Sequence, residues 1–101
     1  MTRDQVIATL RQHEPVSKAV GVVSLSLFGS TAREETDPAD VDIAVRLAER
    51  FSSGGFDYCY QLEQLQQRLS RLIGCKVDVV PEPVRKEHFQ HEIDRDRALA
   101  F

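Results

Sequence analysis

Three features are scarce in this sequence: cysteines, long apolar runs and an excess of charge of one sign. The two cysteines, Cys59 and Cys75, could form at most one disulfide, and they lack the spacing of a metal knuckle or a redox CxxC pair. We therefore expect both to be reduced, as in a cytoplasmic protein. The longest apolar run has only a handful of residues, too few to span a membrane as a helix. The N-terminus lacks the cleavage site of a secretory signal.

The balance of charge also narrows the range of partners. The chain has 13 Lys and Arg residues against 16 Asp and Glu residues, a net charge of -3, so we expect no direct binding to nucleic acid and no membrane partner. This balance still permits a small anionic substrate at one local site. With 101 residues, of which 42% are hydrophobic, the chain has the size and composition of one globular domain at residues 1–101.

The hydrophobic pattern changes between helical and strand periods along the chain. It predicts elements in the order α-β-β-α-β-α, followed by a short last strand. This order favours an α/β (α+β) fold, a small mixed β-sheet with helices packed on one face. In the first strand, Val23, Leu25 and Leu27 are expected to share a face. The expected helices are 4–13, 58–73 and about 84–93, and the expected strands are 22–28, 41–47, 76–80 and 98–101.

The segment LFGSTAREETDPADVDIAV at residues 27–45 carries the residues with the clearest chemical use. Gly29 follows a strand and has no side chain, so a ligand could approach its backbone closely. Ser30 could cap the next turn, where free N–H groups and the serine hydroxyl could bind a phosphate. Taken alone, a Gly-Ser pair after a strand is most often a simple turn.

A pair of carboxylates opens the next strand. Asp40 and Asp42 are two residues apart, so their side chains project from the same face, about 6–7 Å apart at the backbone. Two like charges on one face repel each other, and a bound divalent cation removes that repulsion. Taken alone, an Asp-x-Asp pair is usually a solvated strand edge or a loop cap. Here one short loop joins it to Gly29 and Ser30, which is a much rarer combination.

A third carboxylate, Asp78, lies in the strand expected at 76–80. One interpretation is a polar residue on the exposed face of an edge strand, although Asp is a poor strand former. The other is that this strand pairs with 41–47 and brings Asp78 beside Asp40 and Asp42. Asp78 would then be a metal ligand or a base for an attacking hydroxyl.

Together these motifs resemble the signature of the DNA polymerase beta-like nucleotidyltransferase superfamily. In detail the chain is similar to the MNT-type minimal nucleotidyltransferases, because residues 29–33, Gly-Ser-Thr-Ala-Arg, match their Gly-Ser-x-Ala-Arg motif. The resemblance covers nearly the whole chain and implies the minimal nucleotidyltransferase fold. It implies that Gly29, Ser30 and Arg33 bind the nucleotide. It also implies that the catalytic residues and Mg²⁺ ligands are Asp40, Asp42 and Asp78.

The resemblance further implies a function. MNT-type proteins commonly act as antitoxins of a HEPN-domain ribonuclease toxin. The expected reaction is therefore Mg²⁺-dependent transfer of AMP from ATP to a hydroxyl of a partner protein, with the HEPN toxin as that partner. Two alternatives stay open: a non-catalytic antitoxin that acts by binding alone, and a nucleotidyltransferase subunit for a small-molecule substrate. The sequence leaves open the oligomeric state, including a homo-oligomer, and the choice of nucleotide.

Overall fold

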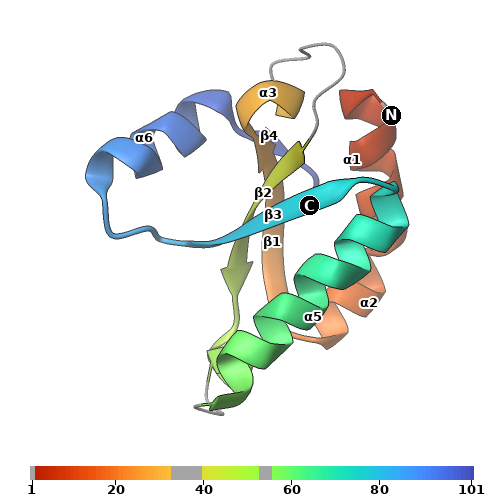
Figure 1. Ribbon diagram of the computed structural model, residues 1–101, viewed down its shortest axis with the longest axis vertical. Coiled ribbons are helices and arrows are strands. Elements are labelled where there is room, and N and C mark those ends of the chain that lie inside the picture. The colour runs from red at the N-terminus through yellow and green to blue at the C-terminus, as the bar shows by residue number, and fades with distance from the viewer. Residues whose placement is uncertain (1, 33–39, 53–55) are drawn as a thin grey trace.

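The computed structural model describes residues 2–32, 40–52 and 56–101 (Figure 1). Helices and strands alternate along the chain in nearly the order that the hydrophobic pattern predicts. The helices are α1 (Arg3–Gln12), α2 (Glu14–Ala19), α3 (Gly29–Ala32), α4 (Glu49–Ser52), α5 (Phe56–Ile73) and α6 (Glu87–Asp96). The strands are β1 (Val22–Phe28), β2 (Asp40–Leu47), β3 (Lys76–Glu82) and β4 (Ala98–Leu99).

The first two helices follow local signals in the sequence. The Thr2 hydroxyl accepts a hydrogen bond from the Gln5 backbone N–H at 3.2 Å, and the Gln5 side chain accepts one from the Thr2 N–H at 2.9 Å. This capping box starts α1. Pro15 lies in the first turn of α2, where its missing N–H leaves no hydrogen bond unmade. Gly21 follows α2 with a φ of 107°, a conformation that ends a helix readily only at glycine.

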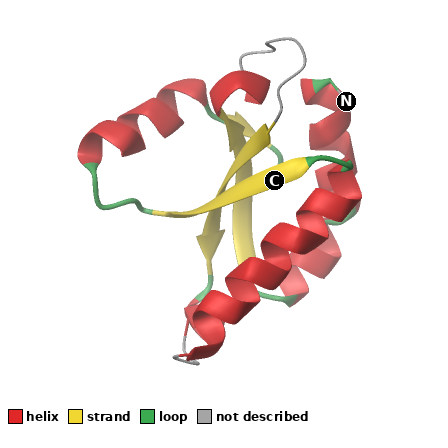
Figure 2. Cartoon of the chain, in the orientation of Figure 1, coloured by secondary structure: helices red, strands yellow, loops and turns green. Residues whose placement is uncertain are grey.

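The strands form one mixed sheet in the order β3-β2-β1-β4, with helices arranged around it (Figure 2). β1 is antiparallel to both β2 and β4, whereas β2 and β3 are parallel. Two parallel neighbours need a long crossover connection, and the segment containing α5 joins β2 to β3. The fold class expected from the sequence, a small mixed sheet with helices, is confirmed.

One face of the sheet carries the main hydrophobic core. Val41, Ile43 and Val45 alternate along β2 and are all buried, because successive side chains of a strand point to opposite faces. Apolar residues of α1 and α5 cover them, so the helix expected at residues 58–73 is confirmed and turns one apolar side to the core. The buried residues of this core are Val6, Leu10, Val22, Leu25, Leu27, Ala32, Val41, Ile43, Val45, Leu65, Leu69, Ile73, Val77 and Ala100.

The start of β1 differs from the expected alternation. Its register with β2 shifts between Val22 and Ser24, and Val23 is 55% exposed whereas Val22 is 1% exposed. The expectation that Val23 shares the core face with the leucines of β1 was therefore wrong. A bulge adds one residue to a strand and so changes which side chains point inward, a shift that regular alternation does not predict.

α6 packs on the opposite face of the sheet, so the expectation of helices on one face was wrong for this helix. Phe28 of β1 and Ala44 of β2 lie on that second face, and Ile93 of α6 packs against them in a smaller buried cluster. The rings of Phe28 and Phe89 meet at 6.0 Å between centroids and 68° between planes, an edge-to-face contact. Figure 1 shows α6 well apart from α1, α2 and α5.

A buried ion pair fixes α6 and β4 to this second face. Arg97 donates hydrogen bonds to both carboxylate oxygens of Glu82, at 2.9 and 2.5 Å, and to the Ser26 hydroxyl at 3.0 Å. Gln90 also donates to Glu82, at 2.6 Å. Burial alone would raise the pKa of Glu82, but the hydrogen bonds from Arg97 and Gln90 outweigh burial and lower it. The Glu82 carboxylate therefore stays charged in a buried position.

α5 closes the outer edge of β3. The Ser70 hydroxyl accepts a hydrogen bond from the Val77 N–H, and the Gln66 side-chain oxygen accepts one from the Val79 N–H, each at 3.1 Å. The next outward-facing position is Pro81, which has no N–H to donate. Edge strands with free N–H groups invite pairing with another chain, so these three positions protect β3 from strand addition.

Two element boundaries differ from the expected ones. β3 continues to Glu82 rather than ending at Val80, since a proline is tolerated on an edge strand. α6 begins at Glu87, about three residues later than expected, and continues to Asp96. Both cysteines are free thiols. In the described part of the chain, no helix combines the length and apolar character needed to cross a membrane.

Candidate active site

The three carboxylates predicted from the sequence lie together on the second face of the sheet, at the start of β2 and β3. Asp42 and Asp78 are direct register partners on these parallel strands, so their backbones are about 4.8 Å apart and their side chains share a face. Asp40 lies two residues before Asp42 on the same face. All three are partly exposed. We call Asp40, Asp42 and Asp78 the acidic row.

Gly29, the residue directly after β1, makes close contact with the acidic row. Phe28, the last residue of β1, is the register partner of Asp42, and Gly29 follows it with a φ of 72°. A Cβ atom at Gly29 would lie 2.5 Å from the Oδ2 atom of Asp42, closer than non-bonded atoms approach. Glycine is therefore required twice, once for the left-handed backbone and once to leave space for the Asp42 carboxylate.

The donor set of the acidic row fits a hard divalent cation such as Mg²⁺. Carboxylate oxygens are its preferred protein ligands. The register of β2 and β3 places two carboxylates, those of Asp42 and Asp78, directly beside each other. The space left by Gly29 allows the Asp42 carboxylate to lie at the centre of the row. Among residues 2–32, 40–52 and 56–101, however, no three His, Cys, Asp or Glu side chains converge closely enough to hold an ion. Metal binding thus stays a prediction from the donor set.

An apolar wall lies beside the acidic row along the same strands. Ala44 follows Asp42 on this face and Val80 follows Asp78, and both belong to the cluster that α6 covers. The acidic row therefore has packed side chains on one side and the end of the sheet on the other. Apolar surroundings strengthen interactions between charges, because they lower the local dielectric constant.

A cation that the sequence interpretation passed over also lies beside the row. Lys76 is the register partner of Asp40, so its side chain shares the face of the acidic row, and it is exposed. Only the pairing of β2 with β3 reveals this neighbour. Its sequence signal was its position two residues before Asp78, which places both residues on one face if the segment is a strand.

The other two predicted nucleotide contacts are described only in part or not at all. Ser30 is the second residue of α3 and directly follows Gly29. Arg33 lies outside the described residues. The roles predicted for Gly29, Ser30 and Arg33 in binding a nucleotide therefore stay predictions.

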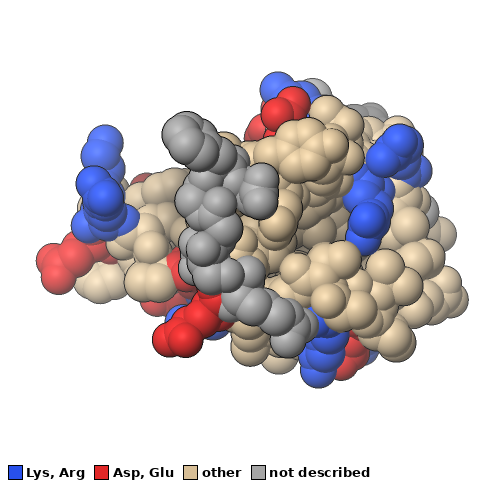
Figure 3. Space-filling model, turned by 90° about the horizontal axis from the view of Figure 1, so that it is seen from below, with Lys and Arg blue, Asp and Glu red and all other residues tan. Residues whose placement is uncertain are grey.

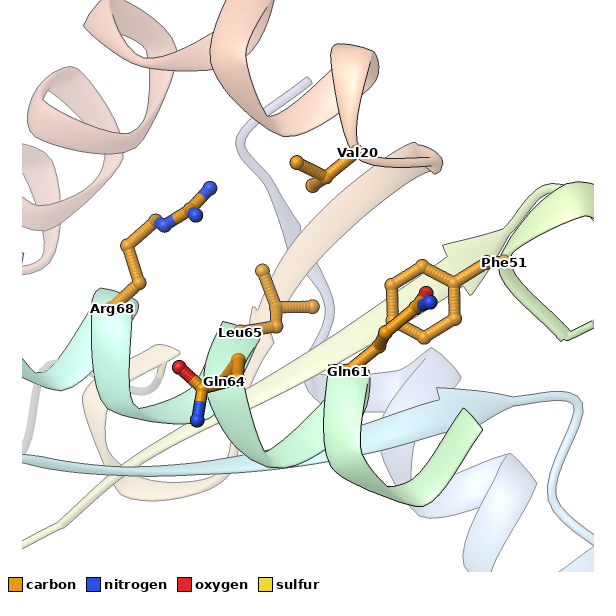
Figure 4. Close-up of a pocket in the computed structure, with 6 residues that line it drawn as sticks. All are labelled: Val20, Phe51, Gln61, Gln64, Leu65 and Arg68. Atoms are coloured by element: carbon orange, nitrogen blue, oxygen red, sulfur yellow. The ribbon is translucent and has the colours of Figure 1, made fainter. Parts of the chain in front are cut away.

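A pocket of about 310 Å³ lies at the end of the molecule away from the acidic row. Gln61, Leu65 and Arg68 project into it from α5, across from Val20 and Phe51 (Figure 4). In the view from this end, residues other than Lys, Arg, Asp and Glu form most of the surface that is described (Figure 3). None of the residues predicted for the active site lines this pocket, so it is separate from the acidic row.

Comparison with known families shows the family to which the chain belongs. The family model described as "Polymerase beta, Nucleotidyltransferase" matches residues 4–101. The chain belongs to this nucleotidyltransferase family. The match includes Gly29, Ser30 and all three members of the acidic row. None of the curated proteins compared with the chain matches it.

Solved structures support the fold of this family member. A protein described as a minimal nucleotidyltransferase has a TM-score of 0.75 and 23% sequence identity, over 97% of this chain and 95% of that one. A mutant of the toxin-antitoxin MntA-HpeT has a TM-score of 0.62 and 19% identity, over 100% of this chain and 73% of that one. At these identities the likeness concerns the fold, and the minimal nucleotidyltransferase fold expected from the sequence is confirmed.

Proposed function

We propose that this nucleotidyltransferase transfers AMP from MgATP to a hydroxyl of a partner protein and so acts as an antitoxin. The observation that carries the proposal is the register of Asp42 with Asp78, with Asp40 on the same face and Gly29 against Asp42. Three carboxylates side by side repel one another. Lys76 lies beside Asp40, and a divalent cation bound among the three carboxylates would offset their repulsion further.

The order of the strands separates two sides of the proposed reaction. Gly29 and Ser30 lie at the end of β1, on one side of Asp42, whereas Asp78 lies on the outer strand β3 on the other side. In the proposal, the triphosphate binds along Gly29 and Ser30, and the acceptor hydroxyl approaches Asp78. Holding both reactants in this geometry supplies much of the rate enhancement that a small protein can provide.

The proposed step is a substitution at the α-phosphorus of ATP. The acceptor oxygen forms a bond to this phosphorus, and the bond from the phosphorus to the oxygen bridging the β-phosphate breaks. Pyrophosphate leaves with that electron pair, and the Asp78 carboxylate accepts the hydroxyl proton. Asp40, Asp42 and Asp78 would hold Mg²⁺, which when bound supplies positive charge opposite the phosphate oxygens.

The identity of the partner rests on the MNT-type motif and on one structural neighbour. That neighbour is a toxin-antitoxin protein in which two aspartates, two positions apart, are each replaced by glutamate. Asp40 and Asp42 have the same spacing. Together with the Gly-Ser-x-Ala-Arg motif, this supports a toxin as the partner, and we propose a HEPN-type ribonuclease as its class.

The test is the intact mass of the partner toxin after incubation with MgATP. We expect the wild-type chain to add one or more AMP masses and Asp78→Asn to add none, because the variant loses the proposed base. Asp4→Asn is the matched control, since Asp4 is an exposed carboxylate of α1 outside the site, and it should modify the toxin as the wild type does. Thermal unfolding of each variant checks that the fold is kept.

Two results would favour the alternatives. If the wild type adds no mass, and Ser30→Ala, Asp40→Asn and Asp78→Asn all still protect cells, the chain is a non-catalytic antitoxin. If the wild type labels a small molecule and leaves the toxin unchanged, the chain is a subunit of a small-molecule nucleotidyltransferase.

A further inference from the structure

A second pocket of about 310 Å³ lies between the last turns of α5 and the start of β3. Lys76, one of its lining residues, is also the register partner of Asp40. The pocket and the acidic row therefore share Lys76 as a neighbour at the outer edge of the sheet. It is lined by Gln66, Gln67, Ser70, Arg71, Lys76 and Val77.

Two cations, Arg71 and Lys76, are the charged groups that line this pocket, beside the polar side chains of Gln66, Gln67 and Ser70. Gln66 and Ser70 already accept hydrogen bonds from the N–H groups of β3. Arg71 and Lys76 are both exposed, and within the described ranges neither forms an ion pair with Asp or Glu. The pocket thus carries two positive charges in a protein whose net charge is -3.

The position of this pocket matches the direction from which an acceptor must approach. In an in-line displacement, the attacking oxygen and the leaving oxygen lie on opposite sides of the phosphorus. If the triphosphate lies toward Gly29 on the β1 side, the acceptor arrives from the β3 side, past Lys76. This step depends on the function proposed above.

We propose that Arg71 and Lys76 bind an acidic segment of the acceptor protein and thereby place its hydroxyl at the acidic row. Complementary charges at an interface speed encounter and favour the correct partner. The closed edge of β3 excludes docking by strand addition there, so recognition depends on these side chains. Two cations beside three carboxylates suit a short acidic peptide segment better than an RNA strand, whose many phosphates require many cationic contacts.

The kinetic test reverses each charge in turn. Lys76→Glu and Arg71→Glu should each raise the KM for the partner toxin about tenfold or more. For Arg71→Glu, whose residue lies on α5 and not in the acidic row, kcat at saturating toxin and the thermal shift with MgATP should stay unchanged. Arg68→Glu is the matched control, because Arg68 is an exposed cation of the same helix that lines the pocket beside Val20 and Phe51. It should stay within about twofold of wild type. If Lys76→Glu and Arg71→Glu behave like Arg68→Glu, the proposal is wrong.

A binding test separates this proposal from the proposed reaction. Fluorescence anisotropy would compare peptides that carry one hydroxyl side chain flanked either by glutamates or by lysines. We expect the wild type to prefer the acidic peptide and Lys76→Glu to lose that preference. Equal binding of both peptides, binding of neither, or tighter binding of a single-stranded RNA would overturn the proposal. A preference for the acidic peptide without any AMP transfer to the toxin would refute the reaction and leave this surface standing.

Discussion

Replacing Gly29 by alanine tests the centre of the candidate site. Gly29 has a φ of 72°, and an alanine there adopts the left-handed region at a cost of about 1 kcal/mol. The new Cβ would also lie 2.5 Å from Asp42 Oδ2, so the carboxylate must rotate away. Such a rotation away from a favoured rotamer costs about 0.5–1.5 kcal/mol. We expect Gly29→Ala to lower the free energy of unfolding by about 2 kcal/mol.

Gly74 offers a matched control for the backbone term. It follows α5 with a φ of 83°, and a Cβ atom there would meet nothing within 4 Å. Gly74→Ala therefore carries the cost of the left-handed backbone without a displaced side chain, and we expect a loss of about 1 kcal/mol. Urea unfolding measures both variants, and each 1 kcal/mol corresponds to about 4–8 °C in Tm for a domain of this size.

The two variants should differ much more in activity than in stability. A misplacement of about 1 Å in a catalytic group can lower a rate about 100-fold, so Gly29→Ala should lose transfer of AMP and most of the thermal shift with MgATP. Gly74→Ala should keep both. If the two variants have the same stability and the same response to MgATP, then the Asp42 carboxylate does not depend on the space at Gly29, and our account of the site is refuted.

The placement of the acidic row could be predicted because it depends on local rules. Side chains of a strand alternate, so Asp40 and Asp42 share a face wherever the strand lies. Asp78 needed one further assumption, that its strand pairs with β2, and the structure confirms the pairing. The fold class followed from the order of helical and strand periods.

Contacts between residues far apart in the sequence could not be predicted from the sequence alone. Arg97 and Ser26 are 71 residues apart, and nothing in either local pattern announces their contact. Alternation along the strand places Ala44 on the same face as Asp40 and Asp42, but an alternating pattern does not reveal whether that face is solvated or covered. The helix α6 covers it, because Ile93 of this helix packs with Ala44 and with Phe28, which is itself the register partner of Asp42.

Three further predictions concern stability. Replacing Gln66 and Ser70 together by alanine leaves two N–H groups of β3 without partners, so the free energy of unfolding in urea should fall by about 2 kcal/mol. Light scattering should also show more association than in the wild type. If neither quantity changes, these two side chains do not protect the edge of β3. Arg97→Met leaves the buried Glu82 carboxylate without its cation, and we expect the free energy of unfolding at neutral pH to fall by about 3 kcal/mol. A decrease below about 1 kcal/mol would contradict the stabilising role of the Arg97–Glu82 ion pair. The last prediction concerns acid. Burial would raise the pKa of Glu82, but hydrogen bonds from Arg97 and Gln90 hold it below the ordinary value of 4.5. Because the folded pKa is lower than the unfolded one, the charged Glu82 contributes stability above about pH 4.5, and this contribution is lost as the pH falls through the folded pKa. As the pH falls from neutral into acid, the free energy of unfolding should therefore decrease less steeply in Glu82→Gln than in the wild type. The two slopes should differ by at most about 1.4 kcal/mol per pH unit, the limit for one titrating group. Parallel curves would show that Glu82 is not a source of acid sensitivity.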